Sequence, residues 1–285
     1  MTPAAPDRLG FTSEQSARLR DLGAEEDIIG QCFERTQDRD AVFLQAEAKL
    51  SSWVRDQVRQ SLAKGGRPAT ELLIESVAEV LSSMGLVQVS TPIIMSRARL
   101  VRMGLENDPL LAAQVFWLDP KRCLRPMLAP HLYEYMLDLS RLATDPYGIF
   151  EIGPCFRKES RGARHANEFT MLNLVEVGLP VEKRRERLSQ LAGVVLDNAG
   201  IKDWRLEQTQ STVYGSTIDV VDSKGLELAS CSIGPHPLDS AWGFDGTWVG
   251  LGIGIERLVM AASGLERMSP VGRGLGRLLG WPLRL

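Results

Sequence analysis

Apolar residues in the first part of the chain recur at the spacing of an α-helix. Within residues 42–62 the apolar positions lie three or four residues apart: Ala46, Leu50, Trp53, Val54, Val58 and Leu62. This is the period of an amphipathic helix, and residues 71–84 repeat it after a Gly- and Pro-containing loop at 64–68. We therefore expect a helical segment over residues 1–68, followed by a second domain over residues 69–285.

After Gly85 the pattern changes to short strands. Alternating or continuous apolar runs, bounded by turn residues, occupy residues 86–89, 114–118, 124–127, 149–156, 168–177, 218–221, 226–230 and 248–252. Helices are predicted over residues 130–142, where Pro130 suits a first helical turn, and over 181–198. Strands joined by hairpin-length turns, with helices set apart from them, predict an α+β domain around an antiparallel sheet flanked by helices.

The composition excludes a membrane protein and a disulfide scaffold. Of 285 residues, 44% are hydrophobic and 24% are charged, and no apolar run approaches the roughly 20 residues of a membrane helix. The first residues lack the apolar core of a secretion signal. The cysteines are scattered without a CxxC pair: Cys32, Cys123, Cys155 and Cys231. Free thiols in a cytoplasmic protein are therefore expected, with no membrane partner.

The net charge of −3 argues against a protein that coats nucleic acid, although two stretches are locally basic. The first holds Arg55, Arg59, Lys64 and Arg67, and the tail holds Arg267, Arg273, Arg277 and Arg284. Clusters of this kind are more often a solvated surface than a nucleic-acid site. They point to RNA only if another feature of the chain does so.

The segment 150–160 is the first with recognisable chemistry. It predicts a strand that ends in Arg157 and Glu159, which share one face because their spacing is two. A polar loop and a returning strand at 168–173 complete a hairpin. The Arg and Glu could form a simple cross-strand pair. Alternatively the hairpin binds an anion: Arg157 would hold a phosphate, Glu159 would accept from a purine amino group, and Phe169 would stack on the base.

Residues 250–258 combine alternating glycines with an arginine at the start of a helix. Glycine weakens a strand by about 0.5–1 kcal/mol relative to alanine, so it suits a strand on which a ligand lies against the backbone. The glycine spacing is not that of a dinucleotide fingerprint. Between the two segments, Glu227 lies in a strand at 226–230. Alone it is an exposed strand residue, whereas beside Arg157 and Arg257 it suggests a divalent cation that bridges phosphates.

Together these segments resemble the three sequence motifs of class II aminoacyl-tRNA synthetases. The motifs are a strand with Val89 and Pro92, the hairpin around Arg157, and the glycine strand that leads to Arg257. More specifically, the chain is similar to the pyrrolysyl-tRNA synthetase family in residues 124–130, 155–160, 168–173, 213–215, 226–228 and 248–250. The similarity covers roughly residues 70–262 and, more weakly, the helices before them.

The resemblance implies an ATP site. Its residues would be Arg157, Glu159, His165, Phe169, Met171, Glu227, Leu228, Ser230, Gly252 and Arg257. Arg157, Arg257 and Glu227 would be catalytic, and Glu227 and Ser230 would hold magnesium. ATP and Mg²⁺ are therefore the expected cofactors.

The resemblance also implies an amino-acid pocket. Its residues would be Ala129, Leu132, Tyr133, Met136, Asn173, Val175, Tyr214, Ser232 and Trp248. An apolar, aromatic cavity with one amide suits pyrrolysine or another lysine acylated on Nε. Asn173 would donate to the side-chain carbonyl and Tyr214 would cap the pocket. Ser216 follows Gly215 where the family usually has Asp, and residues 268–285 match the family poorly.

The implied reaction uses no covalent enzyme intermediate. The amino-acid carboxylate attacks the α-phosphorus of ATP, and the adenylate is then transferred to the 3′ end of the cognate tRNA, which is the expected RNA partner. The chain resembles forms that lack a small basic tRNA-binding domain or keep it as a separate polypeptide. The first motif implies a homodimer, and residues 1–68 would contact the tRNA.

Two other functions remain possible from the sequence. The first is a class II synthetase for another bulky amino acid, such as phenylalanine or phosphoserine, against which Asn173 and the small Ala129 argue. The second is a synthetase-like paralogue that does not charge tRNA. Such paralogues often lose an arginine or the RNA-binding helices, and this chain has both.

Overall fold

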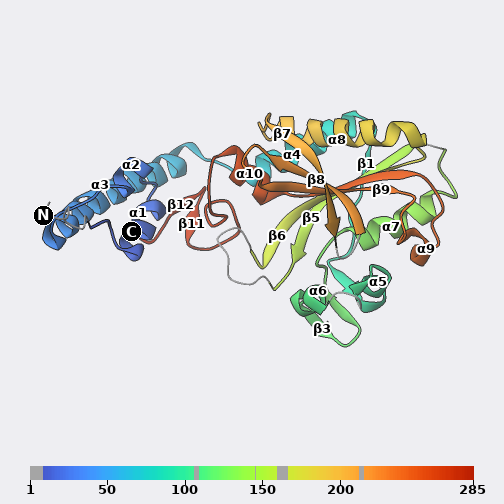
Figure 1. Ribbon diagram of the computed structural model, residues 1–285, viewed down its shortest axis with the longest axis horizontal. Coiled ribbons are helices and arrows are strands. Elements are labelled where there is room, and N and C mark those ends of the chain that lie inside the picture. Colours follow the sequence, from blue (N-terminus) through green and yellow to red (C-terminus); the bar gives the residue numbers. More distant parts are fainter. Residues whose placement is uncertain (1–8, 106–108, 145, 159–165, 212–214) are drawn as a thin grey trace, which may run out of the picture. The chain divides into compact units, whose positions relative to one another are not determined.

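The computed structural model describes residues 9–285 except 106–108, 145, 159–165 and 212–214 (Figure 1). The chain forms two compact units. The small unit is the chain up to Pro68 together with Gly274–Leu285, and the large unit is Ala69–Arg273. The second domain expected from the sequence ran to residue 285, whereas its last residues belong to the small unit.

The small unit is built on one long helix. Its elements are α1 (Ser13–Asp21), α2 (Glu26–Ile29), α3 (Thr36–Lys64), β11 (Arg277–Leu278) and β12 (Trp281–Pro282). Thr12 and Gln15 form a capping box at the start of α1. The C-terminal hairpin joins this unit because the Trp281 ring meets Trp53 edge-on at 4.9 Å and Arg277 pairs with Asp21.

The large unit contains the predicted antiparallel sheet, which confirms the α+β fold class. Within the described residues the strands lie in the order β1 (Val87–Gln88), β5 (Tyr147–Phe156), β6 (Glu168–Val177), β10 (Trp248–Gly254), β9 (Glu227–Gly234), β8 (Gly215–Asp222) and β7 (Trp204–Ser211). β1 runs parallel to β5. The neighbours from β5 to β7 are antiparallel.

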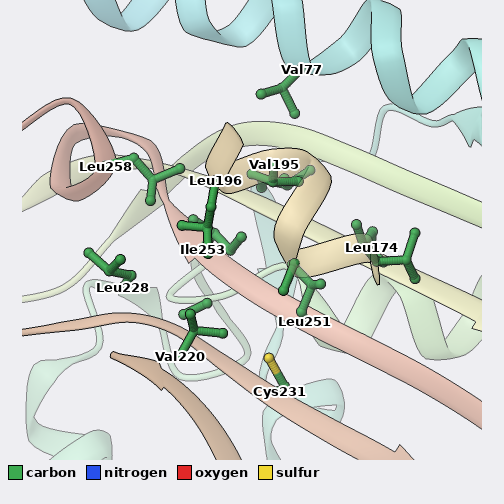
Figure 2. Packing of buried hydrophobic residues seen from close by; sticks show 14 of the residues in the cluster. Val77, Leu174, Val195, Leu196, Val220, Leu228, Cys231, Leu251, Ile253 and Leu258 are labelled. Atoms are coloured by element: carbon green, nitrogen blue, oxygen red, sulfur yellow. The ribbon is translucent and has the colours of Figure 1, made fainter. Parts of the chain in front are cut away.

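Helices α4 (Ala69–Ser83), α8 (Arg184–Asn198) and α10 (Ile255–Ala262) pack on the sheet around the main core (Figure 1). Alternate residues of the central strands point into that core (Figure 2). On β6 and β10 these are Leu172, Leu174, Val249, Leu251 and Ile253. Because strand side chains alternate between faces, their sequence neighbours face the opposite side of the sheet.

A second core lies on that opposite side. It is formed with α7 (Ala129–Leu139), α9 (Asp239–Trp242), α5 (Arg97–Arg102), α6 (Pro109–Gln114) and a small sheet of β2 (Ile94–Ser96), β4 (Arg122–Leu124) and β3 (Trp117–Asp119). In the described part of the chain, no helix is long and apolar enough to cross a membrane.

Several elements differ from the sequence expectation. β7 was not predicted, because its sequence WRLEQTQS is mostly polar and it forms an edge of the sheet. The strand expected over 114–118 is β3, which starts only at Trp117 because Gln114 ends α6. The helix expected over 130–142 is α7, which ends at Leu139. The helix expected from 181 is a 3₁₀ turn, Val181–Lys183, that leads into α8.

Candidate active site

A cavity of about 150 Å³ lies on the face of the sheet opposite α4, α8 and α10. In this first cavity, α7 supplies Ala129, Leu132, Tyr133 and Met136, and the strands supply Asn173, Val175, Ser232 and Trp248. These are all the residues expected for the amino-acid pocket except Tyr214, which lies outside the described residues. The side chain of Ser216 is likewise not described.

Strand register explains why distant residues meet here. Asn173 on β6 is opposite Gly252 on β10, which is opposite Ser230 on β9. One step along, Val175, Gly250 and Ser232 form a parallel row. A Cβ on Gly252 would lie 3.1 Å from Asn173 Oδ1. The glycines therefore leave the floor of the cavity open between flanking side chains.

Among the described residues that line this floor, Asn173 is the one amide. The residue is half-buried, and among the described residues its side chain makes no hydrogen bond. The cavity is otherwise mainly aliphatic and aromatic. A ligand that enters it therefore meets mainly apolar walls, the Asn173 amide and the hydroxyls of Ser230 and Ser232.

A second cavity, of about 200 Å³, lies next to the first. The residues expected for ATP that line it are Arg157, Phe169, Met171, Glu227, Leu228, Ser230, Gly252 and Arg257. Glu159 and His165, expected at the same site, lie outside the described residues. Sequence reasoning missed Ala166 and Met268, which also line it.

Arg157 lies at the edge of both cavities, where two contacts orient its side chain. Its Nε donates to the carbonyl of Pro126 at 2.9 Å, and its guanidinium lies 5.4 Å from the centre of the Phe169 ring. Arg257 donates to the backbone carbonyl of Glu227 at 3.1 Å. Two arginines and an aromatic face thus line one cavity, which suits a nucleotide with its phosphates.

The two cavities share Arg157, Met171, Ser230 and Gly252. A ligand in the first and a nucleotide in the second would therefore meet beside the guanidinium of Arg157. This arrangement suits a reaction between a phosphate and a substrate with a bulky side chain. The guanidinium of Arg157 would stabilise the negative charge that develops during it.

Comparison with known proteins agrees with this geometry. The family model described as tRNA synthetases class II core domain (F) matches residues 56–270. A solved structure of a pyrrolysyl-tRNA synthetase from Desulfitobacterium hafniense is 43% identical, with a TM-score of 0.90, over 99% of this chain and 100% of that chain. A second structure of that enzyme is 44% identical, also with a TM-score of 0.90, over 97% and 99%.

The chain belongs to the pyrrolysyl-tRNA synthetase family of class II. It is thus a ligase that uses ATP to attach an amino acid to tRNA. The family assignment made from the three motifs is confirmed.

The residues expected at magnesium have suitable chemistry. The Glu227 side chain is 51% exposed and lies 3.5 Å from Arg257 Nη1. Ser230 Oγ donates to Asp219 Oδ1 at 3.0 Å, so its lone pairs stay available. Mg²⁺ is commonly held by one or two protein oxygens together with substrate phosphates. The described residues contain no cluster of three or more His, Cys, Asp or Glu that could hold a metal alone.

A buried polar network holds the loop that positions Arg157. Arg125 and Glu151 form an ion pair at 2.7 Å, with both side chains almost fully buried. Thr91 donates to Glu151 and accepts from Arg125. Arg125 also donates to the carbonyl of Pro154. The network therefore ties the first-motif segment to the hairpin strand and fixes Pro126, the acceptor for Arg157. In the sequence Arg125 is recognisable only as part of the segment 124–130 that carries the resemblance.

Glu256, on α10, also holds a segment that lines a cavity. Both of its carboxylate oxygens accept from the backbone N–H of Thr170 at 2.9 Å. That bond anchors β6 between Phe169 and Met171, which line the second cavity. Burial raises the pKa of the Glu256 carboxyl. Its position directly before Arg257 was the signal that could have identified it.

Proposed function

We propose that this synthetase activates pyrrolysine or a closely related Nε-acylated lysine. The observation that carries the proposal is the first cavity, whose walls are apolar and aromatic and whose floor has one amide without a partner among the described residues. The amide of Asn173 would donate to the acyl carbonyl, while the hydrocarbon part of the side chain packs between α7 and Trp248. The shared edge of the two cavities then orients the substrate carboxylate toward ATP.

In the proposed first step, the amino-acid carboxylate attacks the α-phosphorus of ATP and pyrophosphate leaves. Arg157 stabilises the charge that develops on the α-phosphate, and Arg257 binds the outer phosphates. Phe169 and Met171 hold the adenine, with Glu159 and His165 beside it. Bound Mg²⁺, held by Glu227 and Ser230, would neutralise phosphate charge. In the second step the adenylate is transferred to the terminal ribose of the tRNA.

The remaining partners are also proposals. The small unit would contact the tRNA. The basic residues of α3 favour this contact, because they could bind phosphates of the RNA backbone. A separate small tRNA-binding polypeptide could add affinity. The enzyme would act as a homodimer in the cytoplasm.

The test is ATP–pyrophosphate exchange with pyrrolysine, an Nε-carbamoyl-lysine, lysine and the standard amino acids. We expect exchange with the acylated lysines and not with lysine, because an unpaired ammonium in an apolar cavity costs several kcal/mol. EDTA should stop the reaction. Comparable exchange with free lysine would contradict the assigned substrate, and exchange with phenylalanine alone would favour a synthetase for another bulky amino acid.

Asn173→Ala gives a sharper form of this test. It removes the amide from the first cavity and should weaken exchange with the acylated lysines. Asn198→Ala is the matched control, because Asn198 is exposed on α8 and bonds only Ser76 and Val194 among the described residues. Activation without any charging of tRNA in the native enzyme would indicate a paralogue with another acceptor.

A further inference from the structure

Behind the wall of the first cavity lies a carboxylate that neither the motifs nor the proposed reaction uses. Asp239 begins α9 and is only 4% exposed. Tyr133 donates its hydroxyl to Asp239 Oδ1 at 2.8 Å, and Trp248 donates its indole N–H to Oδ2 at 2.9 Å. The backbone N–H of His236 also donates to Oδ2, at 2.6 Å. Two of these donors belong to aromatic residues that line the cavity.

Burying a carboxylate costs free energy, and the packing of two aromatic rings does not by itself require one. In the described part of the chain no Lys, Arg or His forms an ion pair with Asp239, so neutral donors alone compensate the buried charge. Apolar residues of the same volume commonly replace buried charges without loss of stability. A carboxylate has a different advantage here: its two oxygens fix two donors in one geometry.

The rings it holds come from different parts of the fold. Tyr133 lies on α7 and Trp248 on β10, and their ring centres are 5.9 Å apart at 81°. Trp242, also from α9, stacks on Tyr133 at 5.2 Å and 7°. Asp239 thus joins the helix wall of the cavity to its strand wall through two hydrogen bonds.

We propose that Asp239 is a positioning residue that sets the width of the first cavity and thereby selects the size of the Nε-acyl group. The inference rests on the proposed function, because it concerns the side chain bound in that cavity. Asp239 itself touches no substrate. It acts through Tyr133 and Trp248.

The decisive variant is Asp239→Asn. Three donors face the two oxygens of Asp239, whereas an asparagine offers one oxygen and one NH₂ group. With its oxygen toward Trp248 and His236, its NH₂ group faces Tyr133, so the charge-assisted bond that the hydroxyl donates is replaced by a weaker neutral bond that the hydroxyl accepts. The Tyr133 ring is then held less firmly, and the cavity can widen on that side.

The measurement is kcat/KM in ATP–pyrophosphate exchange with Nε-acetyl-lysine as the small substrate and Nε-benzyloxycarbonyl-lysine as the bulky one. In Asp239→Asn we expect the bulky-to-small ratio to rise by about tenfold, which corresponds to the exchange of a charge-assisted hydrogen bond for a neutral one. The KM for both amino acids should rise and the KM for ATP should stay at the native value. A ratio unchanged in a folded variant overturns the proposal.

Glu176→Gln is the matched control. Glu176 is 7% exposed and pairs with Arg187 of α8 at 2.9 Å, on the helix-covered face of the sheet. Its substitution should lower the melting temperature and leave the substrate ratio unchanged. If Asp239→Asn raised the KM for ATP as much as that for the amino acids, a general loss of structure would explain it and the proposal would fail.

Tyr133→Phe keeps the experiment decisive if Asp239→Asn does not fold. It removes the same hydrogen bond from the other side and should shift the ratio in the same direction. A folded Tyr133→Phe with the native ratio overturns the proposal. If the native enzyme activated no acylated lysine, the proposed function would be wrong. That outcome is distinct from failure of the Asp239 proposal, which compares variants with an active native enzyme.

Discussion

At the scale of single residues, the reactive end of the site depends on Arg157. Its guanidinium is at the edge shared by both cavities, and it is oriented by Pro126 and Phe169 rather than by an acidic partner. Among the described residues no carboxylate forms an ion pair with it. Its charge is therefore available to a phosphate.

Arg157→Ala should lower ATP–pyrophosphate exchange by tenfold or more. The variant loses a charge-assisted phosphate contact worth about 1.5–3 kcal/mol, and more if the contact strengthens in the transition state. Arg205→Ala is the control, because Arg205 is half-exposed on β7 and pairs with Glu207. Native exchange rates in Arg157→Ala would refute the assignment of the hairpin to ATP.

At the scale of elements, the glycines of β10 leave room for ligands beside the strand. Gly252 lines both cavities, and its missing side chain leaves room between Asn173 and Met171. Gly250 is similarly crowded, since a Cβ there would lie 3.1 Å from the ring of Trp248 and 3.3 Å from the carbonyl of Leu174. Glycine makes the strand less stable than alanine would, but it allows ligands to approach the backbone of β10.

Gly252→Ala should raise the KM for both ATP and the amino acid. The new methyl group would lie 3.1 Å from Asn173 Oδ1 and 3.3 Å from Met171 Cε, where each ligand approaches the floor. Gly193→Ala, within α8, is the control: its Cβ would make an ordinary 3.5 Å contact with Trp204, and it should stabilise the helix by about 0.5–1 kcal/mol. Exchange kinetics and thermal melting together check this prediction, which fails if Gly252→Ala binds both substrates normally.

The start of α7 introduces a dependence of stability on pH. Burial, and secondarily the charge of Arg99, lower the pKa of His131 below 6.5; its Nδ1 lies 2.9 Å from Thr91 Oγ1. Because the folded-state pKa is the lower one, the fold favours neutral His131. This contribution is complete above pH 6.5 and is lost as the pH falls through the lowered pKa.

We therefore expect the melting temperature to fall on acidification below about pH 6.5. His131→Asn, which keeps a donor toward Thr91, should flatten this part of the profile. Glu151, Glu134 and Arg125 also act on His131, so the comparison is made between the two proteins over the same pH series. Parallel profiles for native protein and variant would show that His131 does not contribute.

At the scale of the whole molecule, the first-motif segment leaves apolar side chains exposed. Val87 is 61% exposed, Ile94 49% and Ile93 43%. Three exposed apolar residues within eight positions of one segment offer apolar surface that an interface would bury, and this is consistent with the proposed homodimer. Light scattering at micromolar concentration should give twice the mass of one chain. Ile94→Asp should reduce it, whereas Val181→Asp, at an exposed site outside this segment, should not. A monomeric native protein would contradict the proposal.

The proposed tRNA contact of the small unit can be tested separately from activation. Trp281→Ala removes the edge-on contact with Trp53 and should loosen the hairpin against α3. We expect tRNA charging to fall while ATP–pyrophosphate exchange stays near native. Leu275→Ala is the control in the same segment, since Leu275 is fully exposed. Equal losses in both assays would argue against a separate role for this unit.

The sequence by itself determined the family, the fold class and most residues around the two cavities. It could do so because period-2 strands, the glycines of β10 and the arginines at strand and helix ends are local signals with direct physical causes. Helix and strand limits were less secure: β7 was missed because an edge strand needs few apolar residues, and α7 ends earlier than its apolar pattern suggested.

Only the tertiary structure decided which distant groups share a hydrogen bond. Asp239 lies 106 residues from Tyr133, and its place behind the cavity follows from how α9 packs on α7. The Arg125–Glu151 pair and the return of the C-terminal hairpin to α3 have the same origin. A polar side chain without a periodic pattern gives no sign of its partner in the sequence, because that partner is chosen by packing across the fold.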